Sequence, residues 1–203
     1  MIELHHLNES RSRRVTWLLE ELGVEYTVIN YQRDASTRLA PPELTAVHPL
    51  GKAPVLRDGH HTIIESGAIV DYLVRHYGKG GFAPAADSPD YEQYVQLMHY
   101  AEGSAALPLL LKLYVGRLGE AGAPLSPRIE SEIANHMGWL DQLLGDRPYF
   151  IGDRLSGADV QLSFIAQVAV RMQGATAFPH LTAFAARMEA RPAYQRAMKK
   201  HGV

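Results

Sequence analysis

Residues 48–56 read HPLGKAPVL and place Pro54 at the start of a short apolar run, Val55 and Leu56. A proline has no N–H to give to a sheet, so it is tolerated at the first residue of a strand, at an edge or at a bulge. If the bond between Ala53 and Pro54 is cis, we expect the backbone groups of Ala53 to point outward and to pair with a ligand. A trans proline that begins an edge strand is the alternative.

The chain before this stretch has the pattern of two parallel strands joined by a helix. Residues 2–7 and 25–31 alternate apolar and polar side chains, which is typical of strands. Between them, residues 13–22 place leucines and Val15 on one helical face, and Gly23 is suited to end a helix. A crossover of this length predicts that the two strands are parallel.

After Pro54 the pattern indicates a hairpin and a helix. Two short β-rich runs flank Asp58 and Gly59, a pair that favours an antiparallel turn. Residues 41–47 are typical of a short helix that begins with proline, and residues 66–77 of a longer helix that ends at Gly78. We therefore predict an α/β domain at residues 1–78 with a mixed four-stranded sheet.

The rest of the chain is predicted to be all-helical. Residues 79–89, rich in glycine, alanine and proline, are predicted to be a linker, and residues 90–203 a helical domain. A long helix is expected from 90 to about 118 with a kink at Pro108, and others at 126–144, 181–190 and 192–200. Ser126 is expected to cap its helix, while Ser156 and Asp159 match a capping box ahead of a helix to Met172.

Composition excludes several classes of function. The net charge of −2 over 203 residues favours no nucleic-acid partner. The sequence has no cysteine, so disulfides, thiolate metal sites and a cysteine nucleophile are excluded. The histidine pairs at 5–6 and 60–61 would point to opposite faces of a strand, so no metal site is expected. No run is apolar over the ~20 residues of a membrane span, and a cytoplasmic protein without a membrane partner is expected.

Four motifs in this order resemble the glutathione transferase superfamily, and the resemblance covers essentially the whole chain. They are residues 10–26 (SRSRRVTWLLEELGVEY), 48–56 (HPLGKAPVL), 63–73 (IIESGAIVDYL) and 150–160 (FIGDRLSGADV). Residues 31–56 resemble the serine-type branch with fungal and bacterial members. The resemblance implies a thioredoxin-like first domain and a helical bundle.

The resemblance also implies where the tripeptide glutathione binds. Ala53 would pair through its backbone with the cysteinyl unit, as an added strand does, while cis Pro54 holds those groups outward. Ser66, at the start of a helix, would bind the γ-glutamyl carboxylate, and Glu65 the α-ammonium group. An ordinary helix cap with an acidic neighbour is the alternative for this pair. Further candidates for glutathione, each also explicable as a surface residue, are Lys52, Arg38 and His48.

A donor near the start of the first helix would have to favour the thiolate of glutathione, whose thiol has an ordinary pKa of ~8.5. Three candidates lie there: Ser10 is the first choice, Asn8 the second, and Ser12 is expected to cap the helix. All three could also be simple caps. The chain lacks the N-terminal tyrosine and the cysteine that other classes of the family use, so mixed-disulfide chemistry at an enzyme thiol is excluded.

The predicted function is therefore that of a glutathione transferase acting on an apolar electrophile or a hydroperoxide, the latter as a glutathione peroxidase activity. Leu107, Leu110 and Tyr114 are candidates for the apolar pocket, with plain core packing or an interface as the alternative. Glutathione is the only co-substrate expected, and no metal. A non-catalytic binding module and a glutathione-dependent isomerase are the competing functions. The resemblance further implies a homodimer.

Overall fold

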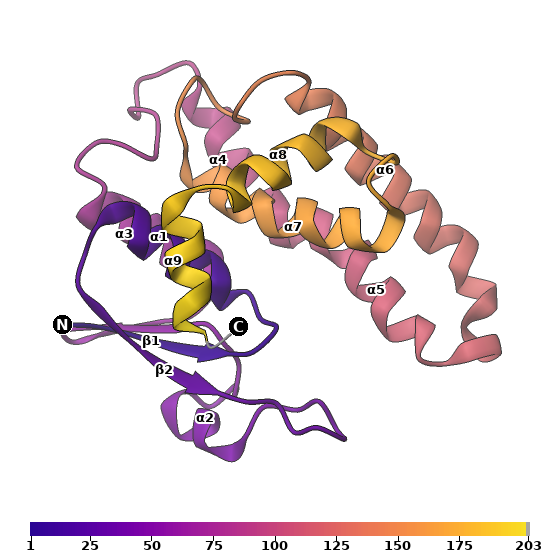
Figure 1. Ribbon diagram of the computed structural model, residues 1–203, viewed down its shortest axis with the longest axis horizontal. Coiled ribbons are helices and arrows are strands. Elements are labelled where there is room, and N and C mark those ends of the chain that lie inside the picture. Colours follow the sequence, from indigo (N-terminus) through magenta and orange to yellow (C-terminus); the bar gives the residue numbers. More distant parts are fainter. Residues whose placement is uncertain (202–203) are drawn as a thin grey trace. The chain divides into compact units, whose positions relative to one another are not determined.

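The computed structural model describes residues 1–201, which form two compact units. The first comprises Met1–Gly81 together with the segment from Glu189 onward, and the second is Phe82–Met188. Figure 1 shows the elements of both units.

The first unit contains a four-stranded mixed sheet, as the sequence predicts. Its strands are β1 (Ile2–Leu7), β2 (Tyr26–Tyr31), β3 (Val55–Asp58) and β4 (His61–Ile63), in the order β2-β1-β3-β4. β1 pairs in parallel with β2, and β3 is antiparallel to both β1 and β4. β1 is an inner strand and is almost wholly buried. Its buried residues are apolar, except for His5 and His6, whose rings bond Tyr31 and Ser12.

Four helices cover this sheet. In Figure 1, α1 (Ser12–Leu22), α3 (Ser66–Tyr77) and α9 (Pro192–Lys200) lie on one face, and the short α2 (Pro42–Val47) on the other. α1 buries the face that carries its leucines against the sheet and α3. It ends at Gly23, whose φ of 64° is the left-handed conformation that glycine adopts without strain. The thioredoxin-like order of strands and helices predicted from the sequence is therefore confirmed.

The position of α9 differs from the domain boundaries predicted from the sequence. Those boundaries assign residues 90–203 to the helical domain, whereas α9 groups with the first unit and residues 82–89 group with the second. The reason is that α9 packs along α1: the rings of Trp17 and Tyr194 meet edge to face, 5.6 Å between centroids. Such a contact joins residues far apart in sequence, so no local pattern indicates it.

The second unit is a helical bundle around α7 (Gly157–Gln173), most of whose residues are buried. Its contacts with the neighbouring helices explain why polar residues of α7, such as Asp159 and Gln161, are buried together with its apolar ones. The other elements are α4 (Tyr91–Tyr100), a π-helical turn (Ala101–Ala105), α5 (Ala106–Gly116), a 3₁₀ helix (Gly119–Leu125), α6 (Ser126–Leu144) and α8 (Pro179–Glu189).

Three local predictions for the second unit have different outcomes. The capping box is confirmed: Ser156 and Asp159 bond each other's backbone N–H groups at the start of α7. The prediction of a cap at Ser126 is wrong, because this residue is already inside α6 and makes no capping bond. Near Pro108, where a kink is predicted, the helix is interrupted by the π-helical turn just before it, because proline has no N–H for the carbonyl of Ser104.

Candidate active site

The loop between β1 and α1 carries the three predicted thiol-activating residues. Ser10 is buried, with 6% of its surface exposed, and its Oγ lies 2.6 Å from Ser12 Oγ. The backbone N–H of Ser12 also donates to Ser10 Oγ at 3.3 Å. Ser12 is the first residue of α1 and does not cap it, so the prediction of a cap at Ser12 is wrong. Its hydroxyl bonds side chains instead of helix N–H groups.

A neighbouring loop holds this segment in place. The N–H of Arg33 donates to Asn8 Oδ1 at 2.7 Å, and Arg33 Nε donates to the Asn8 carbonyl at 3.1 Å. Glu9 forms an ion pair with Arg38, and both residues have positive φ, 53° and 61°. Because Asn8 Oδ1 accepts from the Arg33 N–H, the side-chain NH₂ group of Asn8 points away from Arg33. The structure thus gives Arg38 a partner within the protein and fixes the backbone on either side of Ser10.

Behind the loop, two imidazole rings stack inside the first unit. His6 Nδ1 lies 2.7 Å from Ser12 Oγ, and the His6 ring is parallel to that of His201, 3.7 Å between centroids. His201 Nε2 lies 2.7 Å from Thr16 Oγ1, whose hydroxyl also lies 3.1 Å from the Ser12 carbonyl. The segment after α9 thereby reaches the base of the candidate site.

Both rings are neutral at physiological pH. Burial, and secondly the Arg13 guanidinium, lower the pKa of His6 to about 4. Burial, then the neighbouring His6 and Arg13, lower the pKa of His201 to about 3. In each neutral ring one nitrogen donates and the other accepts, so the direction of each hydrogen bond depends on which nitrogen carries the proton.

The stretch that opens β3 lies beside the end of β1. The register pairs His5 with Val55, so Ala53 and Pro54 are next to the strand end that leads to Ser10. The peptide bond between Ala53 and Pro54 is cis, so the alternative of a trans proline at an edge strand is wrong. Pro54 is buried and Ala53 is half-buried outside the β3 ladder. Of the other candidates, Lys52 is exposed, and His48 Nδ1 accepts from the N–H of Leu50.

The start of α3 brings Ser66 to the same region. Ser66 is buried as the first residue of the helix, and Glu65 before it is exposed with a φ of 65°. Arg14 of α1 is 2% exposed and its Nη1 donates to Ser66 Oγ at 3.1 Å. A buried guanidinium thus supports a helix N-terminus, a combination that attracts a carboxylate.

The predicted apolar pocket residues lie on α5 in the second unit. Leu107 and Tyr114 are about half exposed, and Leu110 is half-buried. With the exposed Leu111 they form one stripe along α5. Leu107 and Tyr114 are therefore not plain core, and their exposure fits either a pocket or an interface.

Sequence reasoning missed Arg14, His6 and His201. Arg14 has a sequence signal, because it lies four residues before Leu18 on the apolar face of α1, where a charge requires a partner. His6 falls on a buried strand, where a polar ring needs a hydrogen bond. His201 has no signal, since its contact with His6 depends on how α9 folds back.

Residues 1–201 contain neither a membrane-spanning helix nor a cluster of metal ligands. None of the described helices is long and apolar enough to cross a membrane. Within the same residues, no three histidine, aspartate or glutamate side chains are placed to hold a metal ion.

Both units match known protein families in sequence. Residues 1–75 match the family described as "Glutathione S-transferase, N-terminal domain", and residues 101–192 match "Glutathione S-transferase, C-terminal domain". "Glutathione S-transferase 3" of Schizosaccharomyces pombe is 35% identical over 178 residues, which are 81% of this chain and 72% of the relative. The chain belongs to the glutathione S-transferase family. "Glutathione S-transferase 1" of Saccharomyces cerevisiae is 31% identical, over 83% of this chain and 81% of the relative.

Solved structures of glutathione transferases have the same fold. A glutathione S-transferase from Actinobacillus pleuropneumoniae superposes with a TM-score of 0.90 at 33% identity, covering 100% of this chain and 93% of that one. A glutathione transferase from Phanerochaete chrysosporium, determined with oxidised glutathione, has a TM-score of 0.84 at 20% identity, covering 99% and 95%. The second likeness concerns the fold alone.

Proposed function

We propose that this glutathione S-transferase binds glutathione on its first unit and holds the thiol as a thiolate with the hydroxyl of Ser10. The observation that supports this proposal is the position of Ser10. Its side chain is buried just before α1, and its hydroxyl oxygen accepts from the N–H of Ser12. The hydroxyl proton of Ser10 can then donate to sulfur. This donor and the positive end of α1 both favour the anion over the thiol.

The reaction follows from a nucleophilic sulfur. The thiol loses its proton to solvent, and the thiolate forms a bond to the electrophilic carbon while the leaving group departs with the electron pair. With a hydroperoxide, the thiolate attacks the outer oxygen and the O–O bond breaks. A second glutathione then gives the disulfide, an alcohol and water. In both cases this chain contributes binding, orientation and a lowered thiol pKa.

The first unit also offers groups for the rest of the tripeptide. The γ-glutamyl carboxylate is proposed to lie at Ser66, whose Oγ accepts from Arg14 and so can direct its own proton to the carboxylate. Glu65, exposed before α3, is proposed to meet the α-ammonium group. By the family resemblance, the Ala53 backbone next to Pro54 pairs with the cysteinyl unit. Lys52 and His48 are proposed to bind the glycine carboxylate of glutathione. Arg38 could bind it too if its ion pair with Glu9 opens. Asn8 is the second candidate for the donor to sulfur.

The co-substrate is proposed to be apolar. The stripe that includes Leu107, Leu110 and Tyr114 supplies apolar and aromatic surface on α5. A ligand that buries such surface gains about 25 cal/mol per Å² of apolar area. A homodimer also remains a proposal from the family resemblance, and a sedimentation mass equal to one 22.5 kDa chain would contradict it.

The test combines calorimetry with turnover. We expect glutathione to bind, and the full chain to conjugate 1-chloro-2,4-dinitrobenzene at a rate that depends on Ser10. Ser10→Ala should lower kcat/KM at least ~10-fold, about 1.4 kcal/mol, while the Kd for S-methylglutathione, which has no thiol proton, stays unchanged. Asn8→Ala is the matched comparison and should have a smaller effect.

Other outcomes identify the competing functions. Binding of glutathione without turnover of any electrophile or hydroperoxide would indicate a binding module. Turnover of an unsaturated substrate with no net consumption of glutathione would indicate an isomerase. If Asn8→Ala costs more than Ser10→Ala, the assignment of the thiol donor to Ser10 is wrong.

A further inference from the structure

A chain of three side chains leads from the interior of the first unit to Ser10. His6 Nδ1 is 2.7 Å from Ser12 Oγ, and Ser12 Oγ is 2.6 Å from Ser10 Oγ. All three side chains are at least 94% buried, so bulk water does not compete for these contacts. Both distances are those of normal hydrogen bonds, and each bond needs one proton.

Counting protons shows that the chain has two possible directions. Each serine hydroxyl has a single proton to donate. If His6 Nδ1 carries a proton, it donates to Ser12, the proton of Ser12 is free to go to Ser10, and the proton of Ser10 is then left for a further acceptor. If Nδ1 is bare, Ser12 must donate to His6 and Ser10 must donate to Ser12. In the second case Ser10 has no proton to offer to sulfur.

The surroundings of His6 make this a choice between two neutral tautomers. Burial and the nearby Arg13 lower the pKa of the ring to about 4, so the doubly protonated form is absent at neutral pH. His201 covers one side of the ring, with an angle of 10° between the two planes, and is itself bonded to Thr16. The stack fixes the ring plane and thereby keeps Nδ1 directed at Ser12.

We propose that His6 is a positioning residue for the transferase reaction: its Nδ1–H tautomer sets the direction of the Ser12 and Ser10 hydroxyls so that Ser10 donates to the sulfur of glutathione. This proposal rests on the proposed role of Ser10. His201 acts one step further away, by holding the His6 ring against Ser12. A purely structural role would instead join β1 to α1 with no preference for either tautomer.

The tautomer can be measured without any substitution. In the full-length chain saturated with glutathione, long-range ¹H–¹⁵N correlation spectra distinguish a protonated ring nitrogen from a bare one. We expect His6, identified by sequential assignment, to have a protonated Nδ1 and a bare Nε2. A protonated Nε2 with a bare Nδ1 would overturn the proposal.

A set of variants tests the effect on sulfur through the ultraviolet absorbance of bound thiolate. His6→Phe keeps a ring for the stack and removes the donor, and should raise the thiol pKa by about half a unit, roughly threefold less thiolate. His6→Asn keeps an N–H donor close to the position of Nδ1 and should restore most of the shift. The control is His5→Phe, which removes an equally buried imidazole that bonds Tyr31 and should leave the thiol pKa unchanged.

The sign of the change separates the possible failures. With the opposite hydrogen-bond direction, His6→Phe would release Ser12 and Ser10 and would lower the thiol pKa. An unchanged or lowered thiol pKa in His6→Phe, with a lowered value in the unmodified chain, would overturn the role of His6 alone. A thiol pKa at the solution value in the unmodified chain would overturn the proposed function and this inference together.

Discussion

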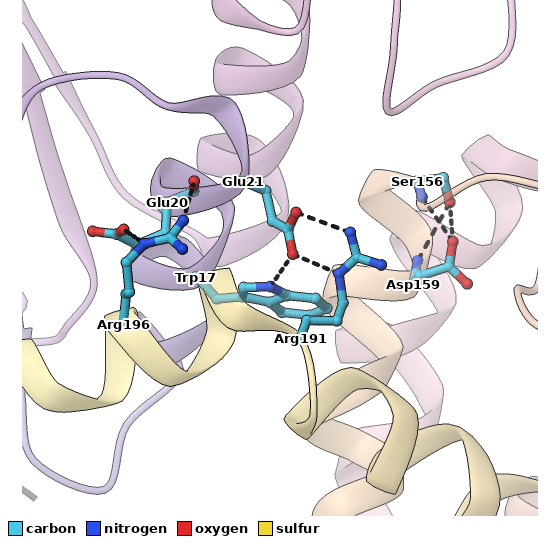
Figure 2. A network of polar contacts seen from close by, with 7 residues as sticks. All are labelled: Trp17, Glu20, Glu21, Ser156, Asp159, Arg191 and Arg196. Atoms are coloured by element: carbon cyan, nitrogen blue, oxygen red, sulfur yellow. Dashed lines mark hydrogen bonds and ion pairs between the residues drawn. The ribbon is translucent and has the colours of Figure 1, made fainter.

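In the first unit, an ion pair joins segments that are 170 residues apart, whereas in the second the buried Asp159 carboxylate accepts from groups at most nine residues away (Figure 2). Arg191, just before α9, donates to both carboxylate oxygens of Glu21 at 2.6 and 3.0 Å, and Trp17 Nε1 adds a third bond at 2.8 Å. In the second unit, Asp159 is bonded to Ser156, three residues away. The first unit therefore includes a contact made by the end of the chain, whereas the start of α7 is held by groups close to it in sequence.

The largest effect is expected at Asp159. Its carboxyl accepts from the N–H of Phe150 and of Ser156 at 2.8 Å each, and from Ser156 Oγ at 2.6 Å. Asp159→Ala should cost about 3 kcal/mol, because it removes a cap and leaves buried donors unpaired. Hydrogen exchange of the α7 amides measures the loss. Ser156→Ala, the matched control, should cost about 1 kcal/mol, and equal losses would show that the carboxyl has no role beyond the cap.

A smaller effect is expected for the contact between distant segments. Arg191→Met should cost about 2 kcal/mol, because it leaves the largely buried Glu21 with one donor from Trp17. Urea unfolding followed by fluorescence in a Trp139→Phe background, where Trp17 is the only tryptophan, reports on this unit. The control is Arg196→Met, which should cost less than about 1 kcal/mol because Glu20 keeps Lys200 and Tyr26. A larger loss from Arg196→Met would contradict the special role of Arg191.

The two units should also differ in the sign of their pH dependence. Burial raises the pKa of Asp159 to about 6, so the folded state keeps a proton that the unfolded state has lost, and stability falls as pH rises from about 4 to 6. For Glu20, burial acts in the opposite sense but is outweighed by bonds from Lys200, Tyr26 and Arg196, which lower its pKa to about 2. Its stabilisation is present above about pH 4.5 and is lost as pH falls toward 2.

Urea titrations of Asp159→Asn and Glu20→Gln at several pH values measure these slopes. Relative to Asp159→Asn, the unmodified chain should lose stability as pH rises through this window, by at most about 1.4 kcal/mol per pH unit. Relative to Glu20→Gln, it should gain stability as pH rises from about 3 to 5. Slopes of the same sign for both pairs would contradict the opposite shifts.

The smallest effect is expected at an exposed ion pair of the first unit. Arg75 and Asp71, one helical turn apart on α3, have side chains that are 60% and 48% exposed. Arg75→Gln should change the unfolding free energy by less than about 0.5 kcal/mol, because water screens the pair. A cost equal to that of Arg191→Met would show that burial does not distinguish the two contacts.

The same comparison explains what the sequence can predict. The capping box at Ser156 and Asp159, the parallel direction of β1 and β2 and the helix end at Gly23 follow from local patterns, and the sequence indicates each of them. The place of α9, the stack of His6 on His201 and the support of Ser66 by Arg14 each join distant segments. Such contacts follow from packing, so only the charge of Arg14 on an apolar face signals one of them.

The candidate site shows the same limit. The sequence indicates Ser10, Ser12 and Asn8 because they lie at or just before the start of a recognisable helix, but it does not indicate their hydrogen-bond partners. A cap at Ser12 is expected from the sequence. In the structure Arg11 already has helical backbone angles, so Ser12 lies inside α1 and does not cap it. Its hydroxyl bonds His6 and Ser10 instead. Which hydroxyl faces sulfur therefore depends on a network that the local sequence does not specify.

A crystal structure of the full chain with reduced glutathione tests the central claim most directly. We predict that the sulfur lies within hydrogen-bonding distance of Ser10 Oγ and that the γ-glutamyl carboxylate meets Ser66 at the start of α3. A sulfur held by Asn8 with Ser10 turned away, or a tripeptide bound away from α1 and α3, would contradict the account.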